Sequence, residues 1–303
     1  MSIFRYTLCL TAMFMAIACS AQETTKPVKF TKPQPVAAQK PAANYDAPDE
    51  AWRSVDPENL LLLDTDHGRI GVELYPEMAP KHVERIKSLA RQKFYNGILF
   101  HRVIDGFMNQ TGDPEGTGRG GSSLPDLTQE FKFRRDVDAV KVELFESGEE
   151  LIGFMKSMPI STQPDEQADL TADFMVEAHG LHCPSVASMA RANDVNSANS
   201  QFFLMRGTAD FLDEQYTIWG VTVMGSDILT KIAVGEVSSN NGFKPDTLNK
   251  AQIAADLPTN YRPKVQVLKT SGPHFETFLN SLDKGDGTFP ELCDIKIPTR
   301  VVK

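Results

Sequence analysis

The feature that most constrains this chain is a stretch, residues 94–121, in which a single cation lies within an apolar run. The run 98–104 contains Arg102 as its only Lys or Arg. After a glycine, the chain continues with two large apolar residues and an amide: Phe107, Met108 and Gln110. This pattern predicts two short strands joined at the glycine. Because alternate side chains share one face of a strand, we expect Arg102 and Gln110 to project toward one apolar surface. The stretch therefore predicts an apolar pocket with one fixed positive charge.

Short apolar runs separated by turn residues occur along much of the chain. They predict strands at 60–65, 69–75, 185–190, 201–206, 216–223 and 264–270. Helical spacing of apolar residues predicts helices at 78–93 and 274–282, and a brief one at 226–233. Even spacing of short strands is typical of a closed antiparallel sheet rather than of alternating strands and helices.

The first 21 residues have the pattern of an export signal. Arg5 supplies the positive charge, and residues 6–18 form an apolar core that is too short to span a bilayer. Two processing patterns compete: residues 16–18 before Cys19 suit lipoprotein processing, whereas residues 19–21 suit ordinary cleavage before Gln22. Either pattern predicts an exported, periplasmic protein, soluble or lipid-anchored through Cys19.

Residues 22–50 contain five prolines interleaved with lysines and show no hydrophobic period. Proline fixes an extended backbone, so this segment is expected to be a semi-rigid tether. The whole chain has a net charge of −9 and a pI near 5.2. Because binding to phosphates needs clustered Lys and Arg, we expect no nucleic-acid partner.

Four sequence motifs resemble those of the cyclophilin-type peptidyl-prolyl cis/trans isomerases and occur in the order typical of that family: FHRVIDGFMNQTGDPEGTGRGG, SMARA, NSQFF and FLDEQYTIWG. The resemblance implies a bacterial exported member with a domain at 58–257, an insertion at 137–180 and a C-terminal extension at 258–303. It implies a mainly β fold, a closed antiparallel eight-stranded barrel with flanking helices. It also implies isomerisation of X-Pro bonds without a cofactor, by a protein expected to be a monomer.

The resemblance assigns roles to individual residues. It implies that Arg102 is the catalytic cation, with Gln110 and Gln201 holding the guanidinium and the peptide. The proline pocket would be lined by Phe107, Met108, Phe203 and Leu212. The backbone of Ala190, Arg191 and Ala192 would contact the residues before proline, and His101 would pack beside Arg102. Four positions depart from the common pattern: Phe211 stands where many members have Trp, Tyr216 where many have His, Arg191 where many have Asn, and Thr111 where many have Gly.

The insertion 137–180 has two distinct halves. Alternation around residues 140–144 and a second apolar run at 151–155 predict a two-stranded hairpin. The acidic segment that follows, 159–174, is loop-like in composition and could be a surface decoration or a lid.

Cysteine usage predicts one disulfide. Cys9 would leave with the signal and Cys19 would be lipidated or removed, so Cys183 and Cys293 remain as the pair available in an oxidising compartment. His179, His182 and Cys183 have a spacing that could hold zinc, but a fourth ligand is missing and we expect no metal.

Two functional hypotheses follow from these residues. The first is an isomerase that acts on X-Pro bonds of exported polypeptides and assists their folding. The second is a non-catalytic proline-binding or chaperone module that keeps the pocket for recognition alone.

Overall fold

The structure, a computed structural model, describes residues 45–138, 143–147, 150–239, 242–283, 285 and 289–302. The predicted signal with Cys19, and the tether as far as residue 44, lie outside these ranges. No helix within them has the length and apolar composition that crossing a membrane requires.

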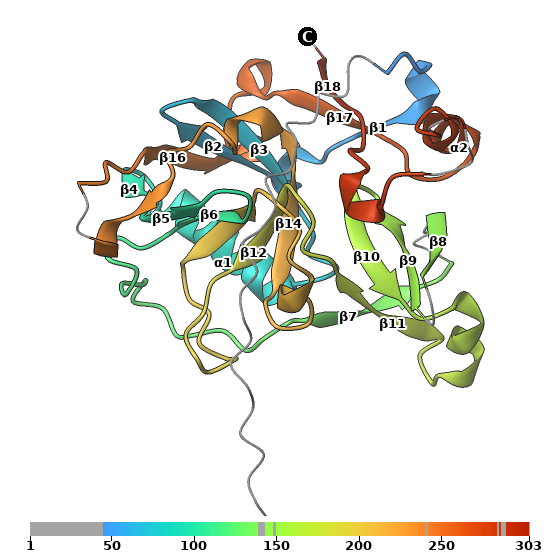
Figure 1. The fold of residues 1–303 in the computed structure, drawn as a ribbon, viewed down its shortest axis with the longest axis horizontal. Coiled ribbons are helices and arrows are strands. Elements are labelled where there is room, and N and C mark those ends of the chain that lie inside the picture. The colour runs from blue at the N-terminus through green and yellow to red at the C-terminus, as the bar shows by residue number, and fades with distance from the viewer. Residues whose placement is uncertain are drawn as a thin grey trace, which may run out of the picture. The chain divides into compact units, whose positions relative to one another are not determined.

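Ten strands form the principal sheet, in the order β15-β5-β6-β13-β12-β14-β3-β2-β16-β4 (Figure 1). Every pairing between its neighbouring strands is antiparallel. The strands are β2 (Leu60–Thr65), β3 (Gly68–Leu74), β4 (Ile98–Leu99), β5 (Arg102–Ile104), β6 (Met108–Thr111), β12 (Val186–Met189), β13 (Phe202–Met205), β14 (Ile218–Met224), β15 (Gly235–Glu236) and β16 (Thr247–Ile253).

The predicted closed, eight-stranded barrel is correct in class but wrong in detail. The sheet has ten strands, and its end strands β15 and β4 are not paired with each other in the described residues. The reason lies at Phe100 and His101, which separate β4 from β5 and interrupt what the sequence suggested was one strand. One half of that segment pairs with β16 and the other with β15 and β6. The sheet therefore curls without a continuous ladder around it.

Alternation along the strands divides the core into two clusters. On β13, Phe202 and Leu204 belong to one buried cluster, whereas Phe203 and Met205 belong to the other. Leu61 and Leu62 of β2 divide in the same way. The first cluster, which we call the inner core, also receives Val83, Ile86 and Leu89 of α1 (Pro80–Arg91). The second cluster lies on the opposite, outer face of the same strands.

The insertion 137–180 supplies four strands of a sheet, rather than a hairpin followed by a loop, and the fifth strand directly precedes it. Five antiparallel strands have the order β7-β11-β10-β9-β8. They are β7 (Lys132–Asp136), β8 (Glu143–Ser147), β9 (Glu150–Met155), β10 (Met158–Thr162) and β11 (Met175–Gly180). The predicted hairpin corresponds to β8 and β9. The acidic segment was wrongly predicted as a loop, because β10 and the 3-10 helix η3 (Asp165–Leu170) lie within it.

The C-terminal extension pairs with residues that precede the principal sheet. Strands β1 (Trp52–Ser54), β17 (Lys264–Leu268) and β18 (Thr299–Val302) form a separate three-stranded sheet, and α2 (Pro273–Asn280) follows β17. Tyr45, assigned above to the tether, contacts this extension: its ring lies 5.3 Å from that of Phe278 and its hydroxyl donates to the His274 carbonyl. The remaining elements are short 3-10 helices: η1 (Asp49–Ala51), η2 (Pro57–Asn59), η4 (Asp210–Leu212), η5 (Ser226–Ile228), η6 (Val237–Ser239), η7 (Ala254–Asp256), η8 (Thr259–Tyr261) and η9 (Leu292–Asp294).

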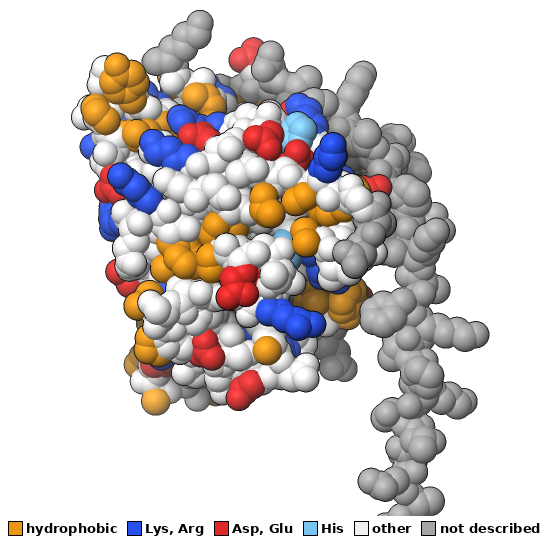
Figure 2. Space-filling view, turned by 90° about the vertical axis from the view of Figure 1, so that its left-hand side faces the viewer, with side chains coloured by type: hydrophobic (Ala, Val, Ile, Leu, Met, Phe, Trp, Pro, Cys, Tyr) orange, Lys and Arg blue, Asp and Glu red, His pale blue; other side chains and the backbone are white. Residues whose placement is uncertain are grey.

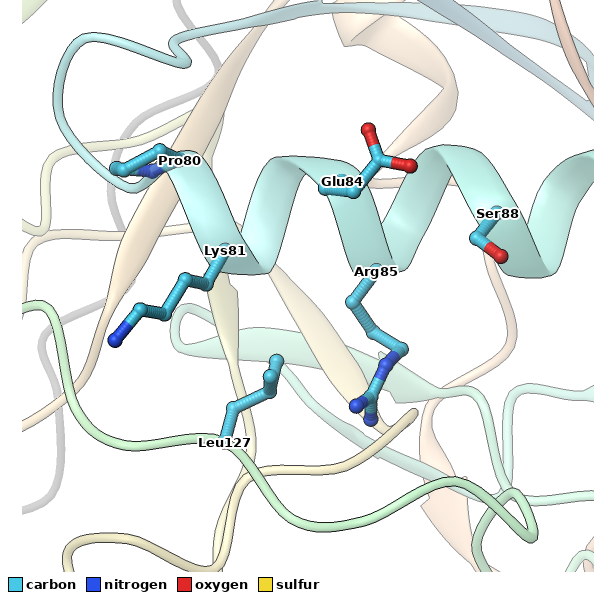
Figure 3. Close-up of a pocket in the computed structure, with 6 residues that line it drawn as sticks. All are labelled: Pro80, Lys81, Glu84, Arg85, Ser88 and Leu127. Atoms are coloured by element: carbon cyan, nitrogen blue, oxygen red, sulfur yellow. The ribbon is translucent and has the colours of Figure 1, made fainter.

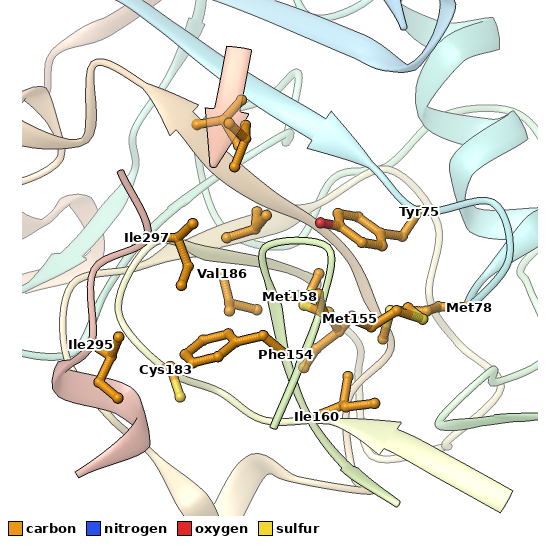
Figure 4. Packing of buried hydrophobic residues seen from close by; sticks show 14 of the residues in the cluster. Tyr75, Met78, Phe154, Met155, Met158, Ile160, Cys183, Val186, Ile295 and Ile297 are labelled. Atoms are coloured by element: carbon orange, nitrogen blue, oxygen red, sulfur yellow. The ribbon is translucent and has the colours of Figure 1, made fainter. Parts of the chain in front are cut away.

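Insertion and extension together cover part of the outer face of the principal sheet. Figure 4 shows Phe154, Met155 and Met158 of the insertion beside Val186 of β12, with Ile295 and Ile297 of the extension nearby. All six side chains are buried, between 0% and 7% exposed. Hydrophobic burial is therefore what attaches the added segments to the principal sheet.

A buried polar junction fixes the turn of the insertion. Glu73 of β3 accepts two hydrogen bonds from Arg53, at 2.6 and 2.7 Å, and a third from the hydroxyl of Ser157, between β9 and β10. The Tyr75 hydroxyl lies 2.9 Å from the hydroxyl oxygen of Ser157 and accepts a hydrogen bond from the backbone N–H of Ser157. Burial raises the pKa of Tyr75, so the phenol stays protonated. A two-pronged arginine–carboxylate pair of this kind specifies position as well as charge.

A disulfide joins Cys183, just before β12, to Cys293 in η9, the pair that cysteine usage predicts. It connects the extension covalently to the segment that enters β12, an interior strand of the principal sheet.

We expect reduction of this disulfide to lower the free energy of unfolding by about 4 to 5 kcal/mol, because it closes a loop of 110 residues in the unfolded chain. Urea unfolding with and without dithiothreitol measures the effect. A Cys183→Ser/Cys293→Ser variant is the control, since its unfolding should not respond to the reductant. An oxidised and a reduced protein with the same midpoint would contradict this expectation.

Candidate functional site

A row of side chains crosses three strands on the outer face of the principal sheet. Arg102 of β5 is the register partner of Gln110 on β6, and Gln110 is the register partner of Phe203 on β13. Ile104, Met108 and Met205 form a second row beside it. Because directly opposed residues on neighbouring strands point to the same face, the cation lies next to an apolar surface. The sequence-based expectation about this stretch matches the observed geometry.

A chain of hydrogen bonds orients Arg102. Its Nη1 donates to Oε1 of Gln110 at 3.3 Å, and Nε2 of Gln110 donates to Oε1 of Gln201 at 2.9 Å. Gln201 in turn donates through Nε2 to the carbonyl of Gly120 at 2.8 Å. Each side-chain amide donates an N–H to the carbonyl oxygen of the next group in the chain. The side-chain oxygen of Gln110 therefore faces the guanidinium. This chain, Arg102–Gln110–Gln201–Gly120, is called the amide relay below.

The last member of the amide relay belongs to a loop organised by Asp113. This fully buried carboxylate accepts backbone N–H groups of Glu115, Thr117 and Gly118 at 2.6 to 2.9 Å. Burial alone would raise the pKa of Asp113, but these donors hold it below its ordinary value. A Cβ at Gly120 would collide with the same carboxylate, so this position requires glycine.

The apolar surface beside the cation, called the notch below, combines buried and exposed rings. Met108, Phe203 and Leu212 are 2%, 5% and 7% exposed and belong to one cluster. The ring of Phe107 lies 5.8 Å from that of Phe211, which is 60% exposed at the surface. The predicted pocket residues are therefore brought together, with the two outermost rings accessible.

Phe203 is positioned from two further sides. The ring of Tyr216 meets it edge-on at 5.8 Å, and the guanidinium of Arg191 lies 4.6 Å above the ring of Tyr216. The imidazole of His182 stacks on Phe203 at 6.1 Å. Sequence reasoning missed this contact, because it considered His182 only as a possible zinc ligand.

Buried hydrogen bonds hold His182 in place. Its Nδ1 lies 2.7 Å from Asp213 and its Nε2 lies 3.1 Å from the hydroxyl of Ser188. Ser188 in turn donates to the Thr217 carbonyl at 3.0 Å. Cys183 is consumed by the disulfide, and within the described ranges no group of three or more His, Cys, Asp or Glu residues could hold a metal.

Two backbone N–H groups of the segment 190–192 already donate hydrogen bonds within the protein. The Ala190 N–H donates to the Gln201 carbonyl, and the Ala192 N–H donates to the hydroxyl of Ser197. The segment therefore cannot offer both N–H groups to a peptide, as a fully added strand would require. Arg191 lies between them and is half-buried.

Two side chains flank Arg102 directly. His101 is 3% exposed, and burial lowers the pKa of its imidazole below the ordinary value. Glu236 of β15, which the sequence did not single out, places Oε1 3.8 Å from Nε of Arg102. Both partners are partly exposed, so this ion pair is weak and can open when a ligand binds.

A hollow also runs along α1, but the described residues that line it include no aromatic side chain of the kind found in the notch. Figure 3 shows Lys81 and Arg85 on the side of the helix that faces Leu127, with Glu84 pointing away. Arg85 is engaged, since it donates to the carbonyls of Asn199 and Pro125. On the face seen in Figure 2, basic and acidic side chains are interspersed with apolar patches, without an extended basic stripe.

The chain was compared with known proteins. The family described as "Cyclophilin type peptidyl-prolyl cis-trans isomerase/CLD" matches residues 60–253. A "Probable peptidyl-prolyl cis-trans isomerase" of Brucella suis is 36% identical over 215 residues, which cover 67% of this chain and 86% of the relative. A "Peptidyl-prolyl cis-trans isomerase-like 1" of Emericella nidulans is 31% identical over 61% of this chain and 86% of its own length.

One solved structure is similar over most of the chain. The crystal structure of cyclophilin AquaCyp293 from Hirschia baltica superposes with a TM-score of 0.75 at 38% identity, covering 83% of this chain and 94% of that one. The match extends well beyond the share covered by the family pattern.

Acidification through the range below about pH 6.5, the ordinary pKa of histidine, should destabilise the protein through His101. Its pKa is lowered in the folded state, so the unfolded chain binds the proton more readily and is favoured as the pH falls. We expect the difference in unfolding free energy between wild type and His101→Gln to shift in favour of the variant from pH 7.5 to 5.5. A difference that is independent of pH would show that burial does not perturb this imidazole.

Proposed function

The chain belongs to the cyclophilin-type peptidyl-prolyl cis-trans isomerases, which are enzymes, and we propose that Arg102 is its catalytic group and that exported polypeptides are its substrates. The observation that carries the proposal is the position of this guanidinium, held by the amide relay at the rim of the apolar notch. In this proposal the enzyme assists folding by interconverting X-Pro bonds.

Rotation about an X-Pro bond is slow because amide resonance must be broken, which costs about 18 to 20 kcal/mol. No covalent bond has to form. In the twisted amide the proline nitrogen recovers a lone pair, which can accept a hydrogen bond that the planar amide cannot accept. A donor at that point therefore stabilises the transition state more than the bound substrate.

The surroundings of Arg102 suit that task. Gln110 occupies one N–H of the guanidinium, and Glu236 lies near another at 3.8 Å, beyond hydrogen-bonding distance. The remaining donors of the fork are free to meet a peptide in the described structure. Phe203, Met108 and Leu212 would hold the pyrrolidine ring in the notch, so that only the acyl side of the bond rotates.

The alternative, a module that binds proline without catalysis, would need only the notch. The amide relay supports catalysis because two polar side chains, Gln110 and Gln201, and the Gly120 carbonyl serve to orient one cation. A binding site for an apolar ring has no use for such orientation.

The substitution Arg102→Ala tests whether this residue is the catalytic group. We expect the isomerisation rate of a short X-Pro peptide, followed in a protease-coupled assay, to fall about tenfold or more, or at least ~1.4 kcal/mol of transition-state stabilisation. Arg69→Ala is a matched control, because Arg69 is exposed and pairs with Asp64 on an adjacent strand. If Arg102→Ala bound the peptide and isomerised it as fast as wild type did, Arg102 would not be the catalytic group.

We also propose export, which the signal pattern at residues 1–21 supports. Mass spectrometry of the protein purified from its native host should find an N-terminus at Cys19 carrying lipid, or at Gln22 without lipid. A Cys19→Ala variant distinguishes the two routes, because it blocks only the first. Recovery of the uncleaved chain from the cytoplasm would refute export.

A further inference from the structure

A cleft lies where β9 and β10, the outer face of the principal sheet and the segment 292–299 meet. Its volume is about 440 Å³, within the range of ligand sites, and we call it the junction cleft. Its apolar lining comes from all three parts: Phe154, Met205, Val221, Val223, Leu292 and Ile297. In Figure 4 the ring of Phe154 extends toward Cys183, Ile295 and Ile297.

The polar lining of the junction cleft includes an arginine whose side chain is almost fully buried. The side chain of Arg206 is 4% exposed; it binds Asp105 at 2.8 Å and the carbonyls of Thr230 and Ile232. Its Nε is nevertheless buried without a partner, as is Oγ1 of Thr222, which also lines the cleft. Both atoms have almost no accessible surface, so Arg206 contributes its positive charge to the cleft rather than a free N–H.

The charged side chains at the rim of the junction cleft are more positive than negative. Asp227 is paired with Lys231 at 2.7 Å, and Asp105 is paired with Arg206. Lys296 lies exposed at the rim and interacts electrostatically with Asp227, so that this carboxylate is shared by two lysines. The charged lining therefore consists of three cations, Arg206, Lys231 and Lys296, and two carboxylates, Asp105 and Asp227. The surplus of one positive charge suits a carboxylate above an apolar floor.

We propose that the junction cleft is a second docking site for the client polypeptide, specific for an apolar segment that carries a carboxylate. The proposal rests on the function proposed above for Arg102. The protein's own tether is a poorer occupant, because residues 22–44 contain four lysines and a single acidic residue.

The junction cleft and the catalytic notch share a wall. Asp105 and Gly106, which line the cleft, connect β5 to β6, the strands that carry Arg102 and Gln110. Four residues of extended chain from Arg102 to Gly106 span roughly 13 Å. A client segment a few residues from its proline can therefore reach the cleft while the proline is in the notch. Engagement of both sites would raise the effective concentration of the X-Pro bond.

The test compares peptides on the full-length protein. One is a short X-Pro peptide; two others carry the segment Leu-Val-Asp-Leu, joined by a Gly-Ser linker before or after the proline. We expect the KM of at least one extended peptide to be about tenfold lower, with kcat unchanged, and the gain to vanish when Lys replaces Asp in the segment. Equal KM values for all the peptides would overturn the proposal.

Matched variants locate the effect. Lys296→Glu should remove the gain and leave the rate on the short peptide unchanged, whereas Lys250→Glu, at an exposed position of β16 outside the cleft, should keep the gain. A gain that survives Lys296→Glu would refute the cleft as its source.

A binding measurement separates this proposal from the catalytic one. Fluorescence anisotropy of a labelled, proline-free Leu-Val-Asp-Leu segment should show binding that Lys296→Glu weakens, even if the short peptide is not isomerised. Failure of isomerisation alone would refute the catalytic role and not the cleft. If decanoate bound at the cleft and the labelled segment did not, a small amphiphile would be the occupant and the proposal would be wrong.

Discussion

The alternation of side chains along the curled sheet is the constraint on which the rest of the structure depends. Even and odd positions of β13 serve two different cores: Phe202 and Leu204 fill the inner one, while Phe203 and Met205 face outward. A shift of register by one residue would exchange the two sets and place Phe203 inside. The notch thus exists because strands that are buried on one side present apolar residues on the other side as well.

The site's rigidity comes from polar groups that never touch the proposed substrate. Asp113 shapes a loop, the loop presents the Gly120 carbonyl, and the amide relay transmits that position to Arg102. On the opposite side His182, fixed by Asp213, stacks on Phe203. Both supports are local hydrogen-bond networks closed by buried groups, which favours a guanidinium and a ring that are already placed before a peptide arrives.

Sequence reasoning predicted most of what depends on neighbouring residues. The hairpin of β2 and β3, helix α1 and the strand alternation around Arg102 follow from local period and turn residues. The pairing of β10 with β11 could not be predicted in this way, because the acidic segment has no local strand pattern. The sheet to which these strands belong is stabilised by contacts with distant elements, such as Phe154 against Phe275 of α2. The positions of Glu236 and His182 depend on strand pairing across long separations, for which a single sequence carries no signal.

The disulfide turns much of the molecule into a covalent ring. Between Cys183 and Cys293 the backbone passes through β12, β13, β14 and β16 and continues into α2, so Phe203 and Tyr216 are both members of the ring. A single proteolytic cut anywhere along it would open the circle without releasing a fragment. The two halves of the notch contributed by this part of the chain would stay tethered to each other after such a cut.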